Sequence, residues 1–190
     1  MEDMVGKYYL LGGVVNDISN KIKVDSDKGR AAYEVIRIIR RVPLFFQDHY
    51  HRLEQTFKEI NLQLELRSAV MMEYIEKLIN ANMTDNCNVK IVVFNEGDKQ
   101  RNLTYISSSY YPTVKEVSEG VKTGVLHIER QNPNAKLINQ SYKNAVNAKI
   151  NEGKYFEAVL VDSLGRVTEG SKSNIFFVKG NEIYTAPGES

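Results

Sequence analysis

Two segments of the sequence concentrate the side chains that could carry chemistry. The first lies between Tyr33 and Arg52, and the second begins at Lys136 and ends in the run VTEGSKSN, residues 167–174. A guanidinium group presents a fork of N–H donors that suits a phosphate or a carboxylate. A desolvated lysine, whose pKa falls toward neutrality, offers a free amine for Schiff-base chemistry. The same residue types are common on solvated surfaces, so the elements that hold them decide whether they form a site.

Metal and disulfide chemistry are not expected. Cys87 is the single cysteine, which excludes an internal disulfide and a cysteine-based metal cluster. His49 and His51 are two residues apart in a predicted helix and point in different directions, so they do not predict a metal site. The nucleotide-binding motifs GxGxxG and GxxxxGK(S/T) are absent as well.

The N-terminal part of the sequence predicts strands followed by two helices. Strands are expected at residues 7–14, 31–39 and 42–46, the last two joined by a turn at Arg40-Arg41. The spacing of the apolar residues then changes to that of a helix. Asp48 is expected as the N-cap of a first helix, and a second helix is expected to begin at Ser68.

Alternation within the strand at 31–39 divides its side chains between two faces. Tyr33 and Arg37 fall on one face, and Glu34 falls on the other. In the helix that follows, His49 lies three residues before Arg52 on the same side, where it could brace the guanidinium group.

The remaining sequence returns to strands. They are expected at residues 88–95, 102–111, 121–129, 156–162, 173–179 and 182–186, with a short helix at about 140–152. The turn-rich segment QNPNAK places a domain boundary between residues 130 and 131. Strands, then helices, then strands again predict an α+β fold rather than a regular βαβ sheet.

The composition is that of a folded, water-soluble protein. Lys and Arg total 25 against 24 Asp and Glu, and this formal net charge of +1 argues against a general nucleic-acid binder. A 42% hydrophobic and 26% charged chain is not disordered. Its apolar runs fall short of the ~18 residues of a membrane helix, and the acidic start MEDMVGK does not resemble a signal peptide. We therefore expect a cytoplasmic protein without nucleic-acid or membrane partners.

The motifs of the two segments resemble one family. The first segment pairs an aromatic residue with Glu34, turns at Arg40-Arg41 and continues into His49-x-x-Arg52-Leu. The second contains AKLIN, EAVLVD, GRVTEGSKSNIFFV and IYTAP in that order. Both are similar to the fold type IV pyridoxal-phosphate enzymes, which include branched-chain and D-amino-acid aminotransferases and aminodeoxychorismate lyase. The resemblance implies a two-layer N-terminal α/β domain over residues 1–130, followed by a β-rich, barrel-like cofactor domain that begins at residue 131.

This resemblance implies pyridoxal 5'-phosphate as cofactor and assigns roles to residues of both segments. Lys136 matches the lysine that forms the Schiff base and moves a proton between two substrate carbons. Glu169 resembles the glutamate that pairs with the pyridinium nitrogen, and Arg52 resembles the arginine that holds the phosphate. Small polar residues would lie beside the cofactor: Ser171, Ser173 and Asn174.

Some assignments rest on the family match alone. Lys143 and Lys149 are close alternatives to Lys136 by sequence. Both fall on the polar side of the predicted helix, which favours a solvent-exposed position for each. Tyr33 matches an aromatic residue that lines the pocket, and Arg37, on the same strand face, could meet a substrate carboxylate.

The resemblance leaves three functions open. An aminotransferase would move an amino group between an amino acid and a 2-oxo acid, as a homodimer in this family. A lyase of the aminodeoxychorismate type would use the same scaffold, although Tyr33 favours transamination. A cofactor-free homologue would serve as a binding module.

The sequence also departs from the family pattern. The lead-in Gly29-Arg30-Ala31-Ala32 lacks an expected acidic residue, and the loop after FNEGDKQRNL lacks an arginine-glycine signature. Family chains continue past the TAP strand, so this sequence is expected to lack their C-terminal part.

Overall fold

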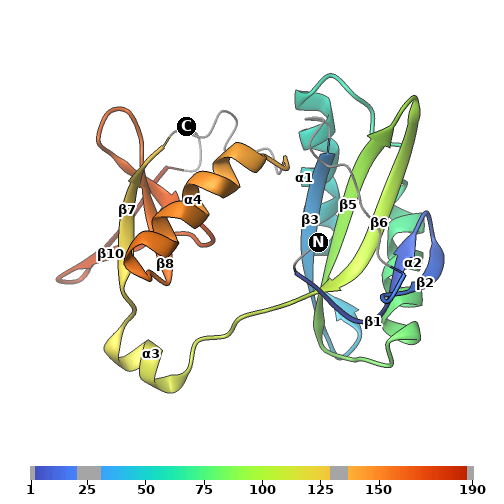
Figure 1. Cartoon of the computed structure of the whole chain (residues 1–190), viewed down its shortest axis with the longest axis horizontal. Helices are drawn as coiled ribbons and strands as arrows, with labels where there is room; N and C mark the ends of the chain where they lie inside the picture. Colours follow the sequence, from blue (N-terminus) through green and yellow to red (C-terminus); the bar gives the residue numbers. More distant parts are fainter. Residues whose placement is uncertain (1–2, 21–30, 129–136, 188–190) are drawn as a thin grey trace. The chain divides into compact units, whose positions relative to one another are not determined.

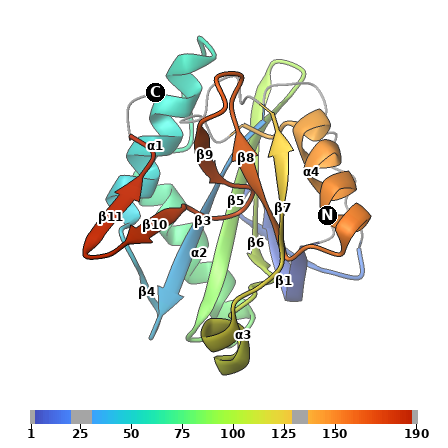
Figure 2. The same ribbon diagram turned by 90° about the vertical axis from the view of Figure 1, so that its left-hand side faces the viewer.

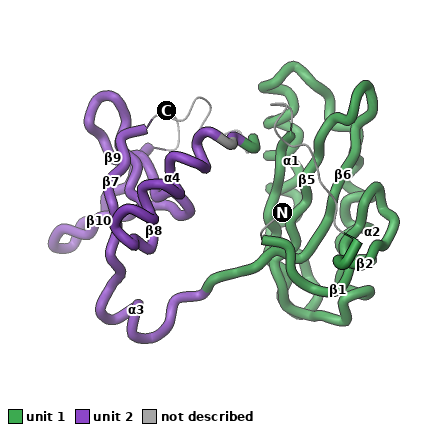
Figure 3. Tube along the Cα trace, viewed as in Figure 1, with its two compact units in different colours: residues 1–110, 134–138 green, residues 111–133, 139–190 purple. Residues whose placement is uncertain are grey.

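The computed structural model describes residues 3–20, 31–128 and 137–187. The chain divides into two compact units, an N-terminal unit of residues 1–110 with 134–138 and a C-terminal unit of residues 111–133 with 139–190 (Figure 3). The boundary predicted between residues 130 and 131 lies outside the described residues and stays a prediction. Among the described residues, no helix combines the length and the apolar character that a membrane crossing requires.

The N-terminal unit is built on a six-stranded antiparallel sheet with the order β2-β1-β6-β5-β3-β4 (Figures 1 and 2). Sequential hairpins join β1 to β2, β3 to β4 and β5 to β6, which is the usual route to antiparallel pairing. The strands are β1 (Met4–Leu11), β2 (Val14–Asp17), β3 (Ala31–Ile39), β4 (Val42–Pro43), β5 (Cys87–Glu96) and β6 (Lys99–Ser107).

The single strand predicted at residues 7–14 is wrong, because the chain reverses inside it. Gly12 and Gly13 have φ angles of 57° and 79° and form a tight turn between β1 and β2. Glycine adopts this left-handed region without steric cost, which is why a Gly-Gly pair between two strands favours a hairpin.

The strand predicted at residues 42–46 is also too long. The turn at Arg40-Arg41 is confirmed, with both residues at positive φ, but β4 ends at Pro43. The backbone N–H of Leu44 then donates to the carbonyl of Arg37. Phe45, at φ 51°, redirects the chain into a helix.

Two helices follow, α1 (Phe46–Glu59) and α2 (Ser68–Ala81). Phe45 is the N-cap of α1 and forms no side-chain cap, so the prediction of Asp48 as N-cap is wrong. Asp48 lies in the first turn instead, where its negative charge suits the helix dipole. The prediction that a helix opens at Ser68 is confirmed.

Both helices pack against the same face of the sheet. The core between them unites fully buried side chains of β3, α1 and α2, including Ile36, Leu53, Phe57, Ile75 and Leu78. Their removal from water supplies the main stabilising term of this unit, at roughly 25 cal/mol per Å² of apolar surface. The opposite face of the sheet has a smaller cluster of buried residues: Tyr9, Ala31, Val92, Phe94, Leu103 and Tyr105.

The C-terminal unit contains a three-stranded sheet with the order β7-β8-β9 and a separate hairpin of β10 and β11. β7 and β8 run parallel and are connected through α4, which packs on both of them. This arrangement is a βαβ unit (Figure 2). The elements are α3 (Val114–Glu119), β7 (Thr123–His127), α4 (Gln140–Gly153), β8 (Glu157–Val161), β9 (Val167–Gly170), β10 (Phe176–Lys179) and β11 (Glu182–Thr185).

Helix α3 and strand β9 are the two elements of this unit that the sequence did not predict. Thr113 accepts a hydrogen bond from the backbone N–H of Glu116, whose side chain returns to the backbone N–H of Thr113. This reciprocal pattern is the capping box, and the sequence pattern T-x-x-E is typical of it.

Truncation of Leu53 should loosen the attachment of α1 to the sheet. Leu53 is 0% exposed, so Leu53→Ala leaves a cavity and should lower the free energy of unfolding by about 2–5 kcal/mol. Gln55→Ala, on the exposed side of the same helix, is the control and should change it by less than about 0.5 kcal/mol. Urea denaturation of the two variants measures the difference, and equal midpoints would contradict the packing described.

Candidate functional site

A fully buried carboxylate lies where β3 meets α1. The side chain of Glu34 is 0% exposed and accepts two hydrogen bonds from Arg52. Arg52 Nε donates to Oε1 at 2.6 Å, and Arg52 Nη2 donates to Oε2 at 2.6 Å. His49 Nδ1 lies 2.7 Å from the same Oε2. We call Glu34, His49 and Arg52 the carboxylate cluster.

The local structure explains how these three side chains meet. Alternation along β3 turns Glu34 toward the helix-covered face of the sheet, as the sequence predicted. On α1, a spacing of three residues places His49 and Arg52 on one side of the helix. His49 does not brace Arg52 alone, because both side chains converge on the carboxylate of Glu34. The pairing of Glu34 with Arg52 was not predicted, since no local signal links a strand residue to a helix residue beyond the next turn.

Arg52 keeps part of its guanidinium group available for a further partner. Its hydrogen bonds to Glu34 raise the pKa of Arg52 above its usual value and outweigh the opposing effect of burial. Its side chain is 42% exposed. Within the described part of the chain, Arg52 Nη1 makes no hydrogen bond, so its donors can serve an anion outside the cluster.

Tyr33 and Arg37 lie on the other face of β3, as predicted, and both are half-buried. Lys90 Nζ lies 5.0 Å from the centre of the Tyr33 ring and 2.6 Å from Asp3 Oδ2. Burial raises the pKa of Asp3, but the hydrogen bond and positive charge of Lys90 outweigh this effect, and the net shift is downward. Arg37 Nη1 donates to Asn88 Oδ1 at 3.4 Å. The face therefore presents aromatic and cationic groups together.

A second buried carboxylate organises a turn in the C-terminal unit. Glu157, at the start of β8 and 9% exposed, accepts hydrogen bonds from the backbone N–H of Lys172 and from Ser173 Oγ at 3.0 Å. A Cβ atom on Gly170 would meet Glu157 Oε1 at 2.6 Å, so a larger residue there would displace the carboxylate from its present position. Ser171 Oγ accepts from the backbone N–H of Ala158 at 3.2 Å. The turn at residues 170–173 is thus tied to β8 at several points.

The other predicted residues of this segment flank the turn. Glu169 is half-buried on β9 and pairs in register with Leu160 of β8. Asn174 follows the turn and is exposed. The structure therefore brings Glu169, Ser171 and Ser173 into one short region of the C-terminal unit, at the edge of its three-stranded sheet.

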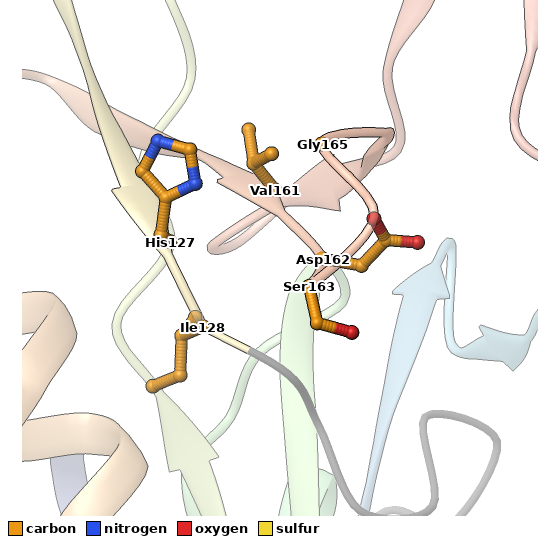
Figure 4. Close-up of a pocket in the computed structure, with 6 residues that line it drawn as sticks. All are labelled: His127, Ile128, Val161, Asp162, Ser163 and Gly165. Carbon is orange, nitrogen blue, oxygen red and sulfur yellow. The ribbon is translucent and has the colours of Figure 1, made fainter.

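The C-terminal unit also has a shallow pocket of about 370 Å³ that none of the predicted site residues lines. Its walls include His127, Asp162 and Ser163 (Figure 4). Asp162 Oδ1 and Oδ2 accept hydrogen bonds from the backbone of Leu164 and from Arg166, and the backbone bond from Arg166 is the main cause of its lowered pKa. The carboxylate is occupied in holding the β8–β9 turn, so we assign the pocket no chemistry.

Lys136 lies outside the described residues. The two alternatives to it are on α4, where Lys143 is exposed and Lys149 is half-buried, with Nζ 3.1 Å from Glu152 Oε2. Among the described residues, no group of three histidine, cysteine or acidic side chains is placed to hold a metal ion.

Comparison with known proteins gives these residues a context. The model of the family described as amino-transferase class IV matches residues 31–190. The chain belongs to this family. It is 28% identical over 171 residues to a D-alanine aminotransferase of Bacillus licheniformis, a match that covers 84% of this chain and 59% of that protein. It is 25% identical over 173 residues to an aminodeoxychorismate lyase of Bacillus subtilis, covering 83% of this chain and 58% of the relative. The chain thus spans less than two thirds of the length of either class IV relative.

Solved structures of class IV members share the fold. A branched-chain amino acid aminotransferase of Escherichia coli superimposes with a TM-score of 0.79 at 20% identity, over 95% of this chain and 68% of that chain. A branched-chain amino acid aminotransferase of Thermobaculum terrenum, solved in its PLP form, gives a TM-score of 0.72 at 19% identity, over 97% and 67%. The α+β fold expected from the sequence is therefore confirmed.

Removal of Arg52 should destabilise the chain by an amount that a surface arginine does not reach. Arg52→Ala removes the paired hydrogen bonds and the positive charge that face the fully buried carboxylate of Glu34, and half-exposure of Arg52 moderates the cost to about 1–3 kcal/mol. Arg101→Ala is the matched control. The two arginine side chains are 42% and 41% exposed, but the partner of Arg101, Glu96, is 67% exposed. Loss of that surface pair should cost less than about 1 kcal/mol.

Chemical denaturation of both variants measures this contrast. An equal loss of unfolding free energy in Arg52→Ala and Arg101→Ala would show that the buried partner contributes nothing.

Proposed function

We propose that this chain is a pyridoxal 5'-phosphate-dependent aminotransferase that moves an amino group between an amino acid and a 2-oxo acid. The observation that carries the proposal is the class IV match over residues 31–190, which includes every residue expected to serve the cofactor. When bound, this cofactor supplies an electron sink for the carbanion formed at the substrate carbon.

The groups present fit such a cofactor. A phosphate needs hydrogen-bond donors in a fixed geometry, and Arg52 offers Nη1, which makes no hydrogen bond within the described residues. The turn at residues 170–173 is held rigidly by Glu157 and presents small hydroxyl side chains. A protonated ring nitrogen needs an anionic neighbour, and Glu169 is a half-buried carboxylate beside that turn.

The roles of the residues follow from their chemistry. Lys136 would hold the cofactor covalently and move the proton between the two substrate carbons. Glu169 would keep the ring nitrogen protonated, through a charge-assisted hydrogen bond of roughly 1.5–3 kcal/mol. Arg52 would orient the phosphate. Ser171, Ser173 and Asn174 would complete the cofactor contacts.

Substrate recognition is assigned to the face of β3 that carries Tyr33 and Arg37. A guanidinium group and a phenol on one strand face can receive a carboxylate and exclude water around it. Both side chains are half-buried, which limits their rotamers.

A lyase of the aminodeoxychorismate type is the second candidate. The 25% identity to the Bacillus subtilis lyase supports it, and the class IV match is common to both reactions. Product analysis separates the two, because a lyase releases pyruvate from aminodeoxychorismate without an added 2-oxo acid, whereas an aminotransferase requires one.

Reduction of the cofactor-loaded chain with borohydride should attach a pyridoxyl label to Lys136. Digestion and mass spectrometry locate the label. Lys136→Ala should abolish the label and lower the transamination rate by at least 10²–10⁴-fold, the usual contribution of general acid–base catalysis, while the chain stays folded.

The lysines of α4 provide the controls for this experiment. Lys143→Ala and Lys149→Ala should both retain the label and most of the activity. A label on either of these residues would overturn the assignment of Lys136. An unlabelled parent chain would favour the cofactor-free binding module and overturn the enzyme proposal.

We further propose that the protein acts as a homodimer in the cytoplasm, as expected from the family resemblance. Sedimentation at micromolar concentration should give a mass of twice 21.7 kDa. A purely monomeric species under these conditions would contradict the dimer.

A further inference from the structure

We propose that Glu34 is a positioning residue, which acts through Arg52 to set the affinity of the chain for a phosphate group. The inference rests on the proposed function, because it takes Arg52 as the phosphate-binding residue. It goes further by giving a role to a carboxylate that touches neither cofactor nor substrate.

The first step is the hydrogen bonding of the carboxylate cluster. A carboxylate accepts hydrogen bonds and cannot donate them, so His49 Nδ1 carries a hydrogen and donates it to Glu34 Oε2 at 2.7 Å. Arg52 Nη2 donates to the same oxygen at 2.6 Å. The 3.1 Å separation of His49 Nδ1 and Arg52 Nη2 is therefore a contact between two donors that share one acceptor.

The second step is the geometry of the guanidinium group. Two parallel hydrogen bonds, from Nε and from Nη2, fix the plane of Arg52 against a carboxylate that is itself immobile in the core. These bonds use one edge of the planar group. The adjacent edge, formed by Nη1 and the second hydrogen of Nη2, makes no hydrogen bond with any described residue and presents a second parallel fork.

The third step concerns charge. Glu34 and Arg52 cancel formally, so the cluster attracts an anion through the orientation of its N–H groups more than through net charge. An arginine on a helix surface otherwise samples many rotamers, and ordering it on binding costs free energy. Glu34 removes that cost in advance, because it holds the fork before a phosphate arrives.

Glu34→Asp tests the inference because it keeps the charge and withdraws the carboxylate by one methylene, out of reach of the paired bonds. Equilibrium dialysis of the full 190-residue chain measures its dissociation constants for pyridoxal 5'-phosphate and for pyridoxal, which lacks the phosphate. We expect Glu34→Asp to weaken binding of the phosphorylated compound about tenfold and to leave pyridoxal binding within about twofold. Glu96→Asp, the same change in the exposed pair with Arg101, is the control and should alter neither.

The same measurements in an Arg52→Ala background show whether Glu34 acts through the arginine. There, Glu34→Asp should no longer change the affinity for pyridoxal 5'-phosphate. A persisting effect, or an equal loss for both compounds, would overturn the inference and indicate a general structural role. Should Glu34→Asp fail to fold, the nearly isosteric Glu34→Gln is carried through the same series, with the same phosphate-specific loss expected.

The outcomes also separate this inference from the proposed function. If Arg52→Ala binds pyridoxal 5'-phosphate as tightly as the parent, the phosphate role of Arg52 is wrong and the inference falls with it. If Arg52→Ala weakens binding and Glu34→Asp does not, the role of Arg52 stands and the positioning role of Glu34 is overturned. A parent chain that binds neither compound overturns both.

Discussion

The burial of one carboxylate constrains the arrangement of the N-terminal unit. Glu34 is withdrawn completely from water, and an ionised carboxylate in such a place is strongly unfavourable unless donors surround it. Arg52 and His49 supply those donors from α1. Helix α1 must therefore pack on β3 in one orientation about its own axis. A shift of the helix sequence by a single residue would rotate both donors away from the strand. The apolar contacts of Leu53 and Phe57 hold the helix on the sheet, and the carboxylate selects its register.

In the C-terminal unit, a buried carboxylate likewise holds a turn in place. Glu157 is almost fully buried, and its oxygens accept from the backbone of Lys172 and the hydroxyl of Ser173. Gly170 allows the carboxylate to approach because any Cβ there would collide with it. In both units a buried glutamate thus fixes a neighbouring segment that carries proposed cofactor-binding residues. Rigid support of this kind is what a binding site requires of its surroundings.

Local patterns in the sequence predicted much of this fold, but they missed several local features and one long-range contact. Alternation in β3 placed Tyr33 and Arg37 opposite Glu34, as the structure confirms. The hairpin at Gly12-Gly13 and the capping box at Thr113 have local sequence signals, a Gly-Gly pair and the pattern T-x-x-E, from which both could have been predicted. The start of α1 had none, because Phe45 adopts a positive φ and forms no side-chain cap. The partner of Arg52 could not be read either, since eighteen residues and a change of secondary structure separate it from Glu34.

Stability alone does not explain the carboxylate cluster. Replacement of a buried ion pair by apolar residues of similar volume is often neutral or stabilising, because it removes the desolvation cost. Leucine or methionine at these positions could pack with the neighbouring Ile36 and Leu53. What an apolar replacement could not reproduce is a half-exposed guanidinium group held in one plane, with a second fork of donors that no described residue engages. The charged arrangement is therefore better explained by the group it orients than by the free energy it adds to folding.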